Sequence, residues 1–143
     1  MGPIHRKTGR VWLATAVALY VALSVTIAAA KPSATAQQEV AHLLDYLARS
    51  GCEFYRNGAW HPAPDARAHL EKKYRYLLDR NRIDTAEHFI ERAATGSSIS
   101  GKPYQVRCGN DGSVESAAWL TQELRRYRET QKGIGRDSAR PQD

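Results

Sequence analysis

Two cysteines constrain the fold of this chain more than any other pair of residues. Cys52 and Cys108 are the only cysteines among its 143 residues. In an oxidising compartment two such cysteines form a disulfide by default, whereas cytosolic thiols stay reduced. Whether the chain is cross-linked therefore depends on the compartment in which it folds.

The N-terminus predicts export. Residues 1–10, MGPIHRKTGR, contain three basic residues and no acidic one, and residues 11–30 contain no charged residue. A basic start, an apolar run and a cleavage site of small residues are the three parts of a secretory signal peptide. We therefore expect an exported chain with a disulfide between Cys52 and Cys108.

Two Ala-x-Ala cleavage sites follow the apolar run, and they end at Ala30 and Ala36. We favour a cut after Ala36, because Pro32 breaks the preceding helix and leaves the extended segment that a peptidase needs. The predicted signal peptide then spans residues 1–36. The alternative is an uncut inner-membrane anchor, because about twenty apolar residues suffice to cross a bilayer.

Net charge argues against nucleic-acid binding. The whole chain has 21 Lys and Arg against 15 Asp and Glu, a net charge of +6. Four of the basic residues and none of the acidic ones precede Gln37, so 17 minus 15 leaves +2 for the remainder. Much of the basic excess belongs to the targeting segment, and no nucleic-acid partner is expected.

The remainder predicts a small α+β domain over residues 37–132, with about four helices, a β-hairpin and a third short strand. Apolar residues at helical spacing mark the four helices. We expect Asp65 and Asp84 to cap the second and third helices. Residues 133–143 have no apolar pattern and are predicted to form a disordered tail.

Asn57 and Gly58 separate two short runs that include aromatic residues, which is a strong signal for a β-hairpin. Residues 104–108 form the predicted third strand. If the two cysteines face each other, the two-residue period of a strand puts Phe54 and Val106 on the core side. The opposite face then carries Glu53, Tyr55, Gln105 and Arg107.

The stretch GSSISGKP, residues 96–103, has the outline of a phosphate-binding loop. However, it leaves a helix and enters a strand, which is the reverse of the order that such a loop requires. Pro103 also stands where the motif has a hydroxyl residue, so we predict no nucleotide binding. Ser97 and its neighbouring serines are expected to close the end of the third helix, because the spacing to Lys102 does not match the catalytic S-x-x-K motif.

The polar face of the predicted sheet is the candidate surface for a ligand or partner. Its candidate residues, with those of the adjoining turns, are Tyr55, Arg56, Trp60, Lys102, Gln105 and Arg107. Trp60 has two interpretations, a lid over the second helix, which we favour, and an exposed anchor for a partner. His61 and His69 match no zinc-binding spacing and are taken as surface residues, so no metal or cofactor is expected.

Several segments together resemble one known family. They are FYRNG, HLEKKY, EHFI, SSISGKPYQVRCG and WLTQELRRYR, and they span about residues 40–128. The combination resembles the YfeK-like family of small exported bacterial proteins of unknown function, with SGKPY and RCG as its most specific parts. The resemblance implies a periplasmic domain and carries over no functional residues.

The prediction is an exported periplasmic, non-catalytic binding or interaction module, whose partner is a periplasmic protein or another envelope component. One alternative is a hydrolase acting on envelope material, with the loop of residues 97–102 and Arg107 as its site. Another is a membrane-tethered assembly factor that keeps its N-terminal segment. A catalytic thiol, with His61, His69 or His88 as base, is disfavoured because both cysteines are expected to be paired.

Overall fold

The structure is a computed structural model that describes residue 2 and residues 31–138. Within these residues the chain forms an α+β domain with four α-helices, a four-stranded antiparallel sheet and one disulfide, which confirms the predicted fold class. Most of the predicted signal peptide, residues 1 and 3–30, lies outside the described residues. None of the helices in the described part is both long and apolar enough to cross a membrane.

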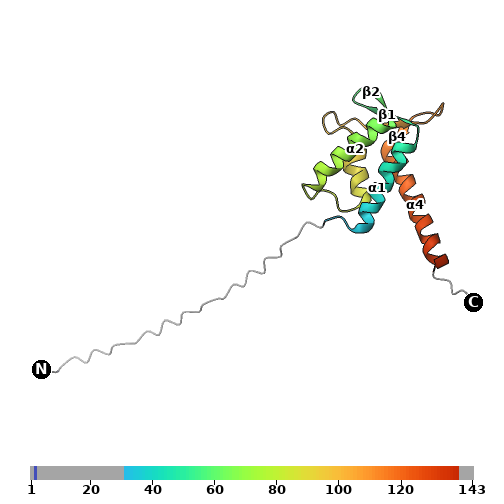
Figure 1. Ribbon diagram of the computed structural model, residues 1–143. Coiled ribbons are helices and arrows are strands. Elements are labelled where there is room, and N and C mark those ends of the chain that lie inside the picture. The colour runs from blue at the N-terminus through green and yellow to red at the C-terminus, as the bar shows by residue number, and fades with distance from the viewer. Residues whose placement is uncertain (1, 3–30, 139–143) are drawn as a thin grey trace, which may run out of the picture.

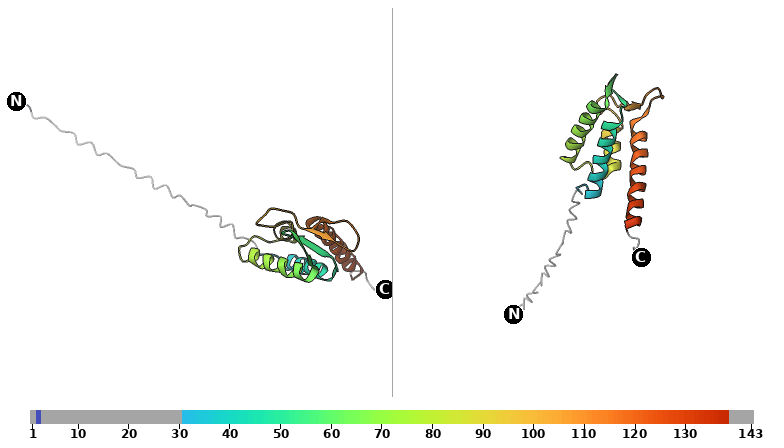
Figure 2. Two further views of the ribbon diagram at one scale, coloured as in Figure 1. Left: turned by 90° about the horizontal axis from the view of Figure 1, so that it is seen from above. Right: turned by 45° about the vertical axis from the view of Figure 1, so that its right-hand side comes forward.

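The chain runs through a helix, a hairpin, two further helices, two short strands and a long final helix. The elements are α1 (Ala34–Arg49), β1 (Glu53–Arg56), β2 (Ala59–Pro62), α2 (Ala63–Leu78), α3 (Ala86–Phe89), the π-helical segment η1 (Ile90–Ala94), β3 (Gln105–Arg107), β4 (Val114–Glu115) and α4 (Ser116–Ser138). The strands lie at one end of the helices, whereas α1 begins and α4 ends at the other (Figure 1; Figure 2).

The β1–β2 hairpin turns at the predicted Asn-Gly pair. Asn57 and Gly58 both have positive φ, 52° and 90°, as a tight two-residue hairpin turn requires. β3 pairs with the other edge of β1, and β4 pairs with β3, so the strand order is β2-β1-β3-β4. The strand β4 (Val114–Glu115) is not predicted from the sequence, because a two-residue strand is too short to display alternation.

The start of α2 differs from the prediction. The helix begins at Ala63, and Asp65 lies in its first turn instead of capping it. Pro64 fits in that turn because the first N–H groups of a helix have no acceptor within it. The Asp65 carboxylate still suits this place, since negative charge near a helix N-terminus is stabilising.

The N-cap of α3 is Thr85, and the prediction of Asp84 is wrong. Thr85 Oγ1 accepts a hydrogen bond from the backbone N–H of His88 at 3.1 Å, whereas the Asp84 carboxylate is engaged by the His88 ring. The helix then widens into η1, where Thr95 Oγ1 donates a hydrogen bond to the Ile90 carbonyl at 2.9 Å.

Both ends of the helical part extend beyond the predicted domain limits. Ser33 caps α1 by accepting a hydrogen bond from the Ala36 backbone N–H at 3.1 Å. α4 continues through Gly133 to Ser138, where the sequence predicts a disordered tail. Extending an existing helix adds hydrogen bonds without a new nucleation step, so this segment is helical despite its lack of an apolar pattern. The predicted tail is therefore corrected as far as Ser138.

The core lies where α1, α2, α3, η1 and α4 meet the inner face of the sheet. The predicted apolar stripes supply most of it, and their fully buried members include Leu43, Leu47, Ala86, Phe89, Ala93, Ala94 and Leu120. Ile83 is also buried, although it lies in the turn between α2 and α3 and belongs to no predicted stripe. Each large apolar side chain buried in this way contributes about 1.5–3 kcal/mol.

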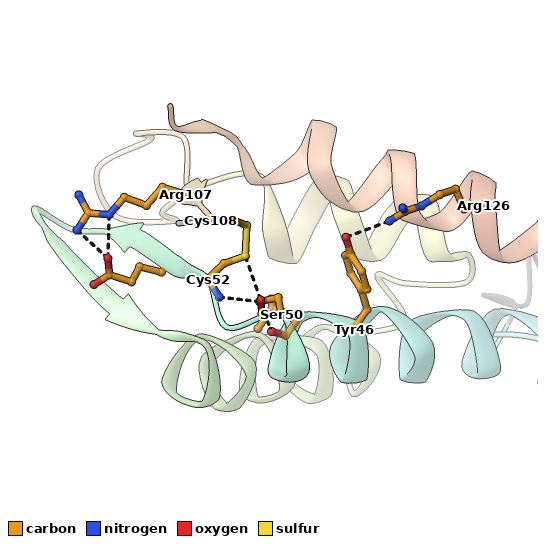
Figure 3. Close-up of a disulfide and its surroundings, with 8 residues drawn as sticks. Tyr46, Ser50, Cys52, Arg107, Cys108 and Arg126 are labelled. Carbon is orange, nitrogen blue, oxygen red and sulfur yellow. Dashed lines mark hydrogen bonds and ion pairs between the residues drawn. A yellow bond between two sulfur atoms is a disulfide. The ribbon is translucent and has the colours of Figure 1, made fainter. Parts of the chain in front are cut away.

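The predicted disulfide joins Cys52 and Cys108 at the end of the β1–β3 ladder (Figure 3). The antiparallel register brings the two cysteines opposite each other, with their Cα atoms 4.4 Å apart. Phe54 and Val106 are buried on the core side of the same strands, as the alternation predicts. The bond therefore connects the half of the chain that contains α1 to the half that contains α4.

Arg128 provides a second connection between the two halves. Its guanidinium donates to both carboxylate oxygens of Glu39 on α1, at 2.6 and 2.9 Å, and to Glu87 on α3 at 2.6 Å. Glu39 is only 6% exposed. The Arg128 guanidinium also lowers the pKa of Glu87 by its hydrogen bond. One side chain of α4 thus neutralises carboxylates on two other helices.

Removing the disulfide is expected to lower the free energy of unfolding by about 4 kcal/mol. The double variant Cys52→Ala/Cys108→Ala restores the loop-closure entropy of a cross-link that spans 56 positions. Urea denaturation followed by circular dichroism measures the change, and the wild-type chain in reductant is the control. A midpoint equal to that of the oxidised wild type would contradict the stabilising role of the bond.

The variant Arg128→Met is expected to lower the free energy of unfolding by about 3–5 kcal/mol, because it leaves the buried Glu39 carboxylate without its partner. Adding Glu39→Gln should recover part of this loss. The matched control is Arg75→Met, whose ion pair with Glu71 is exposed and is expected to contribute less than about 1 kcal/mol. Equal losses for the two single variants, measured by urea denaturation, would refute the buried connection.

Candidate functional site

The outer face of the sheet gathers an aromatic and basic cluster, the Trp60 platform, which consists of Tyr55, Trp60 and Arg107. The register of β1 and β2 places Tyr55 opposite Trp60, and their ring centroids are 5.3 Å apart. The Arg107 guanidinium carbon lies 4.0 Å from the centroid of the Trp60 ring. The three side chains therefore form one cluster that extends across the three strands β1, β2 and β3.

Glu53 fixes the guanidinium of this platform. Arg107 Nε and Nη2 lie 2.9 and 2.8 Å from Glu53 Oε2, so the two side chains form an ion pair between β3 and β1 (Figure 3). The two side chains are 40% and 51% exposed, and such a pair contributes at most about 1 kcal/mol to stability. Its main effect is to hold Arg107 over the Trp60 ring, which leaves the platform ordered before any partner binds.

The structure brings together four of the six predicted surface residues, namely Tyr55, Trp60, Gln105 and Arg107. Arg56 is separated from them, because it follows Tyr55 on β1 and therefore faces the other side of the sheet. Lys102 lies in the exposed loop before β3. The interpretation of Trp60 as a lid over α2 is wrong, because its cross-strand partner and Arg107 both hold it on the outer face.

The loop between η1 and β3 is a closed turn. The backbone N–H of Ser97 donates to the Lys102 carbonyl at 3.0 Å, and Ser97 Oγ accepts from the backbone N–H groups of Ile99 and Ser100 at 3.3 and 3.2 Å. A Cβ at Gly96 would lie 2.8 Å from the Lys102 carbonyl oxygen, so glycine is required there. The Ser97 hydroxyl therefore closes the turn, as the sequence predicts.

A second cluster, the cationic corner, lies where the inner face of the hairpin meets α2. It consists of Arg56, His61, His69, Lys73 and Tyr104, and four of the five line a cavity of about 20 Å³. Lys73 lies beside the cavity, with its ammonium 5.2 Å from the centroid of the Tyr104 ring.

His69 is the most perturbed histidine of this corner. Its Nε2 lies 3.1 Å from Tyr104 Oη, and burial, assisted by Arg56 and the other nearby cations, lowers the pKa of His69 to about 4. His69 is half-buried, so the interpretation of His69 as a surface residue is wrong. In the described part of the chain, no three His, Cys, Asp or Glu side chains are grouped to hold a metal ion.

A larger groove of about 700 Å³ runs between α1 and α2. Leu44, Leu78 and Ile83 contribute apolar surface to it. The charged residues along it carry both signs, with Asp45 and Glu71 paired to Arg67. This balance gives the groove no preference for a ligand of either charge.

His69 should make the stability of the domain depend on pH. Its pKa is about 4 in the folded chain and 6.5 without perturbation, so the unfolded state takes up the proton first. The contribution of His69 to the free energy of unfolding is therefore fully present above about pH 6.5 and is lost as the pH falls towards 4. The variant His69→Asn, which does not titrate, should flatten the stability curve in this window. Identical curves from urea denaturation of variant and wild type would contradict the assignment.

Comparisons with known proteins identify the family of the chain. A family of unknown function, DUF5329, matches residues 34–128, from the start of α1 into α4. A relative from Salmonella typhimurium, "Uncharacterized protein YfeK", is 42% identical over 90 residues, which are 62% of this chain and 73% of the relative. No solved structure matches the chain. The resemblance to the YfeK-like family is thereby confirmed, and the chain belongs to the DUF5329 family of unknown function.

Proposed function

We propose that this chain is an exported, periplasmic and non-catalytic interaction module that binds an envelope protein through the Trp60 platform. The observation that carries the proposal is the cluster of Tyr55, Trp60 and Arg107 on the outer face of the sheet. Trp, Tyr and Arg are the residue types enriched in binding hot spots. Because Glu53 already orders Arg107, a partner that docks here loses little side-chain entropy in binding.

Export is supported by the disulfide and by the N-terminal sequence. Both cysteines are paired, and Cys52 is only 4% exposed, which suits a structural bond of an oxidising compartment. The basic start and apolar run of residues 1–30 have the composition of a signal peptide. A structural disulfide and an export signal in one chain are mutually consistent features.

The helix start favours cleavage after Ala30 over the expected cut after Ala36. Ala36 is buried within α1, and Ser33 supplies the cap of that helix. A cut after Ala36 would remove both, and losing such a cap costs about 1 kcal/mol. A chain that begins at Lys31 keeps the whole of α1.

The position of the platform also accommodates a tethered form. The sheet lies at the end of the molecule opposite to the start of α1 (Figure 1). A partner can therefore reach the Trp60 platform whether the segment before α1 is removed or retained. The Trp60 platform can therefore also be the binding surface of a membrane-tethered protein.

The variants Trp60→Ala and Arg107→Ala test this surface. Each is expected to weaken partner binding by about 2 kcal/mol, roughly thirtyfold, as the loss of a hot-spot side chain does. The measurement is quantitative mass spectrometry of envelope proteins retained by the immobilised wild-type and variant chains. The matched controls are Tyr76→Ala and Arg80→Ala, because the Arg80 guanidinium carbon lies 3.6 Å from the Tyr76 ring centroid on α2, away from the sheet.

A protein whose retention falls with both platform variants and is unchanged by both control variants is the expected outcome. The platform is not the binding surface if the retention of every protein falls equally with the platform variants and with the control variants. The same conclusion follows if Trp60→Ala lowers the retention of no protein.

A further inference from the structure

The cationic corner is a different site from the Trp60 platform. Arg56 and His61 project from neighbouring strands onto the inner face of the hairpin, whereas Trp60 lies on the outer face. His69 and Lys73 stand one helical turn apart on α2 and therefore share a face of that helix. Tyr104 closes the corner from the segment before β3. Side chains that are distant in sequence thus surround one small cavity.

The charges that act on this cavity are all of one sign. The groups that bear on His69 are Arg56 on β1, His61 on β2, and Lys72 and Lys73 on α2, and each of them opposes protonation of the His69 ring. No carboxylate lines the cavity. Like charges gathered without a counter-charge are unfavourable, and the arrangement becomes favourable when an anion binds among them.

Several of these cations are also without a partner. In the described part of the chain, the side chains of Arg56, His61 and Lys72 form no hydrogen bond or ion pair with another residue. Arg107 and Arg128, in contrast, each bind a carboxylate. Lys73 is held in place, because its ammonium donates to the Gly96 carbonyl at 2.9 Å. The corner therefore combines a fixed ammonium with an unengaged guanidinium.

We propose that the cationic corner binds a tetrahedral oxyanion, a sulfate or phosphate group, through Arg56, His61 and His69. A guanidinium presents several N–H donors in a planar fork that matches the oxygens of such a group. The cavity of about 20 Å³ has room for about one water-sized group. One oxygen of the anion therefore enters the cavity beside His69 and Tyr104, and the others remain at its mouth.

Anion binding at this site is coupled to proton uptake. A bound anion replaces the repulsion among the cations by attraction, so it raises the pKa of His69 from its value of about 4 in the free chain. The complex consequently holds more protons than the free protein below neutral pH, and the affinity for the anion increases as the pH falls. Arg56, His61, Lys72, Lys73 and Tyr104 are the titratable or charged groups that face His69 in this corner.

Sulfate is the appropriate probe, because its own charge stays constant over this pH range. Sodium sulfate is titrated into the ¹⁵N-labelled exported domain at constant ionic strength, and dissociation constants are taken from the NMR shifts of the Arg56 and His69 amides. At about pH 5 the wild type should bind at least fivefold more tightly than at about pH 7.5. Arg56→Gln should weaken binding about tenfold or more, as the loss of one charge-assisted hydrogen bond does.

Two further variants complete the test. The variant His69→Asn should remove most of the pH dependence, and unchanged spectra outside the corner establish that each variant is folded. The control Arg80→Gln removes a guanidinium from the turn that follows α2 and should leave sulfate binding unchanged. The proposal would be overturned if sulfate binding does not saturate at either pH, or if Arg56→Gln and Arg80→Gln weaken sulfate binding equally.

The same variants identify the source of the anion. If inorganic phosphate competes with sulfate, and phosphatidylglycerol vesicles cause no additional Arg56-dependent binding, the ligand is a free or soluble phosphate group. If the vesicles bind the wild type and lose binding with Arg56→Gln, the phosphate belongs to a lipid headgroup. Either result supports an oxyanion site in the corner.

Discussion

The disulfide between Cys52 and Cys108 lies where the end of α1, the start of β1 and the end of β3 come together (Figure 3). Gly51, with a φ of 67°, reverses the chain directly after α1 and leads it into the bond. The bond then fixes β3 beside β1, and Phe54 and Val106 consequently face the helices. The faces of the sheet, the core and the platform all depend on this register.

Polar contacts between α1 and α4 stabilise the packing of the first helix against the last. His42 and Glu123 approach within 2.6 Å, and the His42 ring stacks on Tyr127 at a centroid distance of 4.0 Å. Tyr46 accepts a hydrogen bond from Arg126 at 3.0 Å (Figure 3). These contacts lie along the same helix pair as the buried pair of Glu39 and Arg128. Ion pairs along α1 and α4 thus add to the covalent bond that joins β1 and β3.

The two candidate sites arise from one hairpin. Because successive side chains of a strand point to opposite faces, Tyr55 and Trp60 lie outside and Arg56 and His61 lie inside. The outer set is aromatic with a paired arginine, and it suits a protein partner. The inner set is cationic and enclosed by α2, and it suits a small anion. A single hairpin therefore presents two chemically different surfaces.

Local patterns predicted much of the fold. The Asn-Gly turn, the apolar stripes and the cysteine pair depend on neighbouring residues or on one strong constraint, and they were found. Contacts between distant side chains at the two candidate sites were not predicted: the position of Arg107 over the Trp60 ring requires the order of three strands, and the cationic corner requires the angle between α2 and the hairpin. The cap of α3 was misassigned for a local reason, since Asp84 and Thr85 are adjacent acceptors and the structure uses the second.

Intact mass measurement of the protein recovered from cells, with thiols alkylated before and after reduction, tests the central claim most directly. The protein is expected to begin at Lys31 and to accept two alkyl groups only after reduction. A full-length chain with both thiols alkylated before reduction would contradict both export and the disulfide on which the fold depends.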